Sequence, residues 1–210
     1  MAEIFSEDLV AISENIVEDF KNLYESKERY DTIITVGDEQ NAEQIYAHSQ
    51  ILCARSSYFR RALSDEWAVK KMVAMFYQIL KQMQFLYCGI VDLKGQNDET
   101  ILGLLITADE LLIQSLIDIV QSLLIQNCYT FLQQSPIRML HFITHYKRFK
   151  ELNEAYLETI CKNPSLLFDS DEFLSLEENI FYQIDPKEFV PEVWEYMDIL
   201  PKDLIKDVVH

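Results

Sequence analysis

The chain has 210 residues, of which 49% are apolar, so it can form one large domain or two small ones around a hydrophobic core. Asp and Glu total 35 against 18 Lys and Arg, a formal net charge of −17, which repels phosphate backbones and anionic lipid surfaces. We therefore expect neither a nucleic acid nor a membrane as a partner. With only 4 Gly and 5 Pro, the sequence favours helices over many-stranded sheets.

The first predicted element is an amphipathic helix that starts at Ser6, whose side chain can cap it ahead of Glu7 and Asp8. Apolar residues recur along it every three or four positions, at Leu9, Ile12, Ile16, Phe20 and Leu23. One face of this helix is too apolar to remain in water. We therefore expect the helix to pack against a partner chain.

Two short strands and two short helices are predicted next. The β-branched run Thr32–Val36 indicates a strand that ends at a Gly-Asp turn, and Glu43–Ala47 is its predicted partner. His48–Arg55 and Ser57–Leu63 are predicted helices, and the pair Ser56-Ser57 is available to cap the second.

Helices are predicted over most of the remaining chain. Gly89 suits the position just after a helix, Ser135-Pro136 is typical of a helix start, and Asn163-Pro164 restricts the backbone where a helix ends. The predicted helices are Met72–Tyr87, Thr100–Ala108, Leu111–Gln126, Ile137–Lys147, Glu151–Cys161 and Asp171–Ile184, with short helical pieces after Val190. The C-terminal half is therefore expected to be a stack of antiparallel helices.

The cysteines and the apolar stretches indicate the cellular compartment. The four cysteines form no CxxC pair and no metal-type spacing, which is typical of reduced core cysteines in an intracellular protein. They are Cys53, Cys88, Cys128 and Cys161. The N-terminus is acidic where a signal peptide needs basic residues, and Asp109 and Asp118 interrupt the most apolar stretch, Ile101–Ile125. We expect a soluble protein of the cytoplasm or the nucleus.

The segment Tyr30–Phe59 resembles the opening of the BTB/POZ domain, a protein–protein interaction module. The matching positions are Asp31 before the first strand, Ala47-His48 at the following corner, and Ser56 with Tyr58-Phe59 at the end of the first helical pair. Phe85–Gly89 is similar to the end of the family's fourth helix. Leu123–Cys161 resembles the BACK domain, a helical neighbour of BTB domains, and the combination is similar to fungal proteins of the kelch/TLDc type.

The resemblance implies a mostly α fold with a small N-terminal sheet. It divides the chain into an amphipathic N-terminal helix (1–29), an α+β BTB/POZ core (30–122) and an incomplete all-α BACK-like domain (123–210). A helix ahead of a BTB core often packs against the partner chain of a dimer. The expected dimer interface consists of Leu9, Ile12, Ile16, Phe20, Asp31 and Ser49.

Three departures from the family pattern bear on function. About ten residues are missing after Lys71, so the sheet is expected to lose an edge strand. Many dimerising members have a basic residue where this chain has Ser49, so the buried Asp31 needs another partner, solvation or a raised pKa. Cullin-binding members have Glu where this chain has Val69. The expected cullin interface is Phe59, Leu63, Trp67, Val69 and Tyr87.

Two functions remain open from the sequence. The chain is a self-associating interaction module, homodimeric or paired with another BTB protein, which presents an unknown substrate protein to a cullin-based ubiquitin ligase. Alternatively, it is an oligomerisation scaffold that has lost cullin binding. Trp67, flanked by charges, is either a half-buried plug or an interface anchor.

Catalysis and cofactor binding are not expected. The chain has no GxSxG nucleophile elbow and no glycine-rich phosphate loop. His141 and His145 have a spacing that can bind zinc, but Arg138 and Arg148 lie on the same helical face and oppose a metal ion. His48, Asp31 and the acidic clusters at the two ends are interpreted as structural or solvated. We expect no enzyme activity, no cofactor and no metal.

Overall fold

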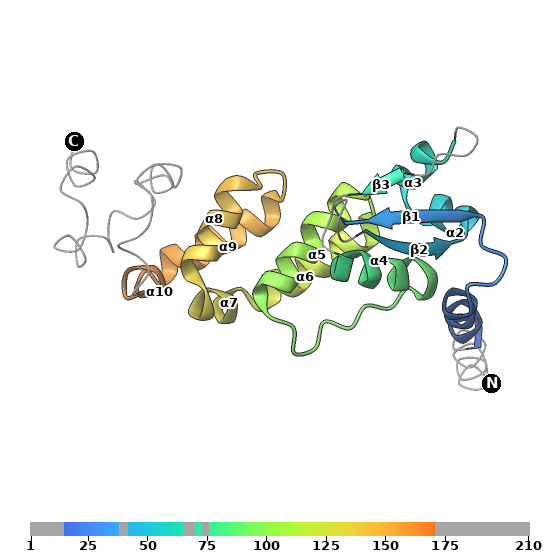
Figure 1. The fold of residues 1–210 in the computed structure, drawn as a ribbon. Helices are drawn as coiled ribbons and strands as arrows, with labels where there is room; N and C mark the ends of the chain where they lie inside the picture. Colours follow the sequence, from blue (N-terminus) through green and yellow to red (C-terminus); the bar gives the residue numbers. More distant parts are fainter. Residues whose placement is uncertain (1–14, 38–41, 65–69, 73–75, 171–210) are drawn as a thin grey trace, which may run out of the picture. The chain divides into compact units, whose positions relative to one another are not determined.

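The structure is a computed structural model that describes residues 15–37, 42–64, 70–72 and 76–170 (Figure 1). The chain divides into two compact units, Met1–Val120 and Gln121–His210. The boundary falls within α6, two residues before the expected start of the second domain.

The first unit contains a three-stranded sheet of order β2-β1-β3. Its strands are β1 (Thr32–Val36), β2 (Glu43–Ala47) and β3 (Lys70–Met72). β1 pairs antiparallel with β2, and Ile34 lies opposite Ile45. Because alternate residues of a strand face opposite sides of the sheet, Ile34 and Val36 are buried on one side together with Ile45 and Ala47. The strand itself, Thr32–Val36, is what the β-branched run in the sequence predicts.

The third strand corrects the expectation of a lost edge strand. β3 pairs in parallel with β1, with Ile34 opposite Lys70 and Val36 opposite Met72. The helix that follows, α4 (Phe76–Cys88), begins at Phe76 and not at Met72 as predicted. Three residues that include two lysines carry no recognisable strand pattern, so the free edge of β1 decides their conformation.

Two short helices follow the sheet, α2 (Ser49–Arg55) and α3 (Ser57–Ala62), as predicted. Ser56 separates them and caps α3, because its Oγ accepts a hydrogen bond of 3.1 Å from the backbone N–H of Phe59. The same hydroxyl donates to the carbonyl oxygen of Leu111 at 2.5 Å. Ser56 is 1% exposed, so this one side chain ties the α2–α3 pair to the end of a distant helix.

The remaining helices of the first unit are α4, α5 (Asp98–Glu110) and the first part of α6 (Gln114–Gln126). α4 packs against α2 and α5 and ends at Gly89, which has a φ of +70° and donates to Phe85 O at 2.8 Å. Asn97 caps α5 by accepting from Thr100 N. The buried residues of α4 to α6 form the largest part of this unit's core.

The second unit is entirely helical where it is described. Its helices are the end of α6, α7 (Cys128–Gln134), α8 (Pro136–His145), α9 (Lys150–Lys162) and α10 (Ser165–Phe168). α7, α8 and α9 pack against one another, and α10 packs against all three. Pro136 stands at the start of α8 as predicted, whereas the predicted helix Asp171–Ile184 lies outside the described residues.

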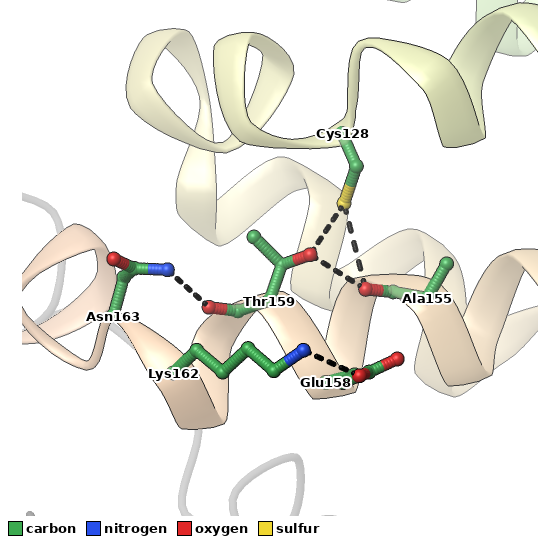
Figure 2. Close-up of polar contacts among 6 residues, drawn as sticks. All are labelled: Cys128, Ala155, Glu158, Thr159, Lys162 and Asn163. Atoms are coloured by element: carbon green, nitrogen blue, oxygen red, sulfur yellow. Dashed lines mark hydrogen bonds and ion pairs between the residues drawn. The ribbon is translucent and has the colours of Figure 1, made fainter.

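Figure 2 shows how α7 is joined to α9 in this unit. The Cys128 thiol lies 3.4 Å from Thr159 Oγ1 and 3.7 Å from Ala155 O, and the Thr159 hydroxyl donates to Ala155 O at 2.7 Å. Burial raises the pKa of Cys128, and the Thr159 contact opposes that rise only in part. Cys128 is therefore a protonated packing residue and not a reactive thiol.

Candidate interaction surface

The junction between the N-terminal helix (residues 15–26) and the sheet is held by a network of three residues. Tyr87 Oη of α4 lies 2.8 Å from the backbone N of His48 and 2.7 Å from its ring Nδ1. The other ring nitrogen, His48 Nε2, lies 2.8 Å from the carbonyl oxygen of Glu28. A side chain from the end of α4 thus reaches, through His48, the backbone that leads from the N-terminal helix.

The partners determine which atoms carry the protons. A carbonyl oxygen only accepts, so His48 Nε2 donates to Glu28, and in the singly protonated ring Nδ1 is then an acceptor. Tyr87 Oη accepts the hydrogen bond from the His48 backbone N–H and donates its own proton to Nδ1. Burial raises the pKa of Tyr87 to about 12, although the hydrogen bond from His48 lowers it and Tyr24 and Asp31 raise it further. The Tyr87 hydroxyl, held protonated by its raised pKa, thus bonds both the backbone N–H and the ring of His48.

The backbone on either side of Glu28 is strained. Lys27 and Arg29 have φ values of +54° and +53°, in the left-handed region that costs a non-glycine residue about 1–2 kcal/mol. Ser26 Oγ accepts from Glu28 N at 3.4 Å, and the ring of Tyr24 lies 5.0 Å from that of Tyr87. These contacts fix the direction in which the N-terminal helix leaves the core.

Asp31 is exposed in the structure, which corrects the expectation that it is buried. Its two carboxylate oxygens accept from Ser49 N and from Ser49 Oγ, each at 2.6 Å, and Thr32 Oγ1 lies 3.2 Å away. Asp31 thus caps the first residue of α2. Partial burial is the largest single effect on its pKa and raises it, but the bonds from Ser49 and Thr32 together outweigh it and lower the pKa.

The N-terminal helix leaves two large apolar side chains in solvent. Ile16 is 50% exposed and Phe20 is 38% exposed, and they lie one turn apart on the same face. Leu23, on the next turn, is half-buried. The other two residues expected on this apolar stripe, Leu9 and Ile12, lie outside the described residues.

The residues expected at a cullin interface are not gathered on one surface. Phe59 and Tyr87 are 3% and 4% exposed, so they belong to the core of the first unit, and their contact with a cullin stays a prediction. Leu63, at the end of α3, is half-buried. Trp67 and Val69 lie outside the described residues, and their roles stay predictions.

Three features of this region were missed by reasoning from the sequence. Ser56 was predicted to cap α3, but nothing in the sequence shows that its hydroxyl also reaches Leu111. Tyr87 was assigned to a partner surface, although Tyr in an apolar run, FLYC, is also typical of a buried hydroxyl that needs a partner. Tyr30 and Tyr46 pack edge to face at 4.7 Å with Lys27 over the Tyr46 ring, a pair that only the strand register brings together.

The described residues contain no cluster of His, Cys, Asp or Glu placed to bind a metal ion. His141 and His145 are both exposed on α8. None of the helices in the described ranges has the length and hydropathy needed to cross a membrane. The polar contacts of the first unit thus orient its elements, and its exposed apolar side chains are suited to binding protein.

Comparison with known proteins agrees with this fold. The family model of the BTB/POZ domain matches residues 20–128, and the chain therefore belongs to the BTB/POZ domain family. One solved structure with a match is the BTB domain of zebrafish PATZ1, which is 24% identical to this chain. The match covers 53% of this chain and 90% of the PATZ1 domain, with a TM-score of 0.46. No curated protein matches the sequence.

Family membership defines the class of function. BTB domains are protein-interaction modules that self-associate and pair with other BTB proteins, and they are generally not enzymes. The predicted fold class, a mostly helical BTB core with a small sheet followed by helices, is confirmed.

Proposed function

We propose that this chain is a self-associating scaffold whose dimer interface includes the apolar face of the N-terminal helix. The observation that carries the proposal is the exposure of Ile16 and Phe20 on a helix whose other end is fixed to the core. Two large apolar side chains left in water on one helix face are unfavourable in an isolated unit. A second copy that covers this face removes both side chains from water.

Burying these two side chains contributes to holding two copies together. Fully burying an Ile or Phe side chain contributes about 1.5–3 kcal/mol, so burying the exposed part of each contributes about 1 kcal/mol. Because a two-fold interface counts every contact twice, Ile16 and Phe20 together contribute about 4 kcal/mol. Leu9 and Ile12 extend the same stripe in the sequence. Asp31 and Ser49 lie near the junction of this helix with the core.

The test is the solution mass of the full chain by analytical ultracentrifugation over a range of concentrations. We expect a dimer for the wild type and a shift towards monomer for Ile16→Asp/Phe20→Asp. The matched control is Asn15→Asp/Asn22→Asp, which adds the same charge at exposed positions of the same helix. A wild-type monomer at micromolar concentration, or equal dissociation of the two double variants, would contradict the proposal.

The role of substrate adaptor for a cullin-based ubiquitin ligase is the second candidate. Its support is the family resemblance at Phe59, Leu63 and Trp67. The described residues favour the scaffold, because Phe59 and Tyr87 are buried in the core. A titration of the full chain with a cullin N-terminal domain separates the two functions: binding that is lost in Trp67→Ala and strengthened in Val69→Glu supports the adaptor, and no binding supports the scaffold.

The second unit is proposed to be a BACK-like helical domain that holds a client protein or a further domain. Its support is the sequence resemblance over Leu123–Cys161 and the packing of α7, α8 and α9. The cytoplasm or the nucleus is the proposed location, supported by four cysteines that are all free thiols.

A further inference from the structure

The charge of the second unit is unevenly distributed. Although the chain contains 35 Asp and Glu, none occurs between Asp118 and Glu151. Basic residues are concentrated at the end of that interval. We name this set the basic face: Arg138, His141, His145, Lys147, Arg148 and Lys150.

All six residues are exposed, on α8, in the turn that follows it and at the first residue of α9. Arg138, His141 and His145 follow the helical spacing along α8 and are exposed, whereas Leu140 and Ile143 between them are buried. The last three residues lie in the α8–α9 turn and at the start of α9, and all are exposed. The Arg148 guanidinium lies over the rings of Tyr146 and Phe149 at 5.5 and 5.4 Å, which restrains its position.

The described part of the chain ends beside the opposite end of α8. A hollow of about 420 Å³ lies between the α7–α8 corner and the end of α10, and its lining includes Gln133, Pro136, Asp169 and Ser170. α10 itself packs against α7, α8 and α9. Ser170, the last described residue, therefore lies near the first turn of α8, where Pro136 is two residues before Arg138.

The sequence after Ser170 is strongly acidic. Residues 171–210 contain eleven Asp and Glu against three Lys, and the acids start at once with Asp171-Glu172 and continue at Glu177-Glu178. The ten residues of α8 span about 15 Å, at about 1.5 Å per residue. Members of the two acidic pairs are five to seven positions apart in the sequence, which corresponds to about 20 Å in an extended chain and about 9 Å in a helix. The length of α8 lies between these two values.

We propose that the acid-rich segment after Ser170 binds the basic face of its own second unit. The segment and the face have opposite charge, their charged groups match in length, and the connection between them is covalent and short. A short connection raises the effective concentration of the segment above that of any acidic partner in solution.

The test measures backbone amide exchange of residues 171–190 in the full chain. We expect exchange to be about tenfold slower in the wild type at low salt than in Lys147→Glu/Lys150→Glu, and to rise in the wild type at high salt. The matched control is Lys94→Glu/Lys162→Glu, which changes the charge equally at exposed lysines outside the basic face. The control should exchange like the wild type. Circular dichroism of each variant verifies that the helices remain folded.

Three results would overturn the proposal. The first is equal exchange of residues 171–190 in the wild type and Lys147→Glu/Lys150→Glu at low salt. The second is protection that increases with protein concentration, which would place the segment on a second copy. The third is unprotected exchange in the wild type together with binding of a polyglutamate peptide, an oligonucleotide or phosphatidylserine vesicles to the basic face. If Lys147→Glu/Lys150→Glu is unfolded, Lys147→Gln/Lys150→Gln replaces it, with partial loss of protection expected.

Discussion

Removing the hydroxyl of Tyr87 tests whether the junction below the N-terminal helix is held as the structure indicates. Tyr87→Phe keeps the ring, which is 4% exposed and contacts Tyr24, but deletes the partner of the His48 backbone N–H and of Nδ1. Each neutral hydrogen bond contributes about 0.5–1.5 kcal/mol net, so the variant should lose about 1–3 kcal/mol near neutral pH. The exposed Tyr129 provides the control, because Tyr129→Phe should change stability by less than about 0.5 kcal/mol.

The pKa of Tyr87 adds a second, independent test. Burial raises it from 10.0 to about 12, so folding favours the protonated hydroxyl. The stability that this hydroxyl contributes is therefore fully present below pH 10 and is lost as the pH rises towards about 12. The difference in free energy of unfolding between wild type and Tyr87→Phe should therefore be smaller at about pH 11 than at about pH 9. It should fall by at most about 1.4 kcal/mol for each pH unit.

The assay is urea unfolding under reducing conditions, followed by circular dichroism. Amide exchange in α4 reports the first unit separately, because a chain of two units need not unfold in one step. The reasoning would be refuted by equal losses in Tyr87→Phe and Tyr129→Phe. If the difference in stability between wild type and Tyr87→Phe is the same at about pH 9 and at about pH 11, the assignment of a buried, protonated Tyr87 hydroxyl is refuted.

Three further substitutions test the first unit. Asp31→Asn weakens the cap on Ser49 and should lower the free energy of unfolding by about 0.5–2 kcal/mol near neutral pH. Hydrogen bonds lower the pKa of Asp31 from 3.8, so the stability that its carboxylate contributes is present above pH 3.8 and is lost as the pH falls below it. Acid titrations of the stability of the wild type and of Asp31→Asn would show this loss. Leu112 has a φ of +50° and is 42% exposed. Leu112→Gly should therefore raise the free energy of unfolding by up to about 1 kcal/mol, measured as a higher melting temperature. Gln82 is fully buried and donates to Thr107, while its Oε1 has no partner among the described residues. In urea unfolding, Gln82→Met should change the free energy of unfolding by less than about 1 kcal/mol, whereas Gln82→Glu should lower it by more than about 3 kcal/mol.

Each of these predictions has a contrary result. An Asp31→Asn deficit that persists unchanged at acid pH would show that the carboxylate charge does not matter. A lower melting temperature for Leu112→Gly would mean that the exposed side chain contributes more than its backbone strain costs. Equal effects of Gln82→Met and Gln82→Glu would contradict the burial of that position.

Local features of the fold could be predicted from the sequence because they depend on neighbouring residues. The β-branched run Thr32–Val36 indicates strand β1, and Ser56 caps the next helix through a bond that spans three residues. Gly89 ends α4 because a positive φ suits a residue without a Cβ. The apolar stripe through Ile16 and Phe20 follows from helical spacing alone. For the same reason the similarity to BTB domains was visible in the sequence.

Contacts between distant residues were decided only by the tertiary structure. β3 exists because Lys70–Met72 meets the free edge of β1, an edge that no local pattern reveals. Asp31 was expected to be buried, yet it is exposed and caps α2, because the corner at His48 turns the backbone of Ser49 towards it. Tyr87 was assigned to a surface, whereas its hydroxyl completes the bonding of His48, 39 residues away. Residues near in sequence share a pattern, but partners far apart are chosen by packing, which one-dimensional spacing does not encode.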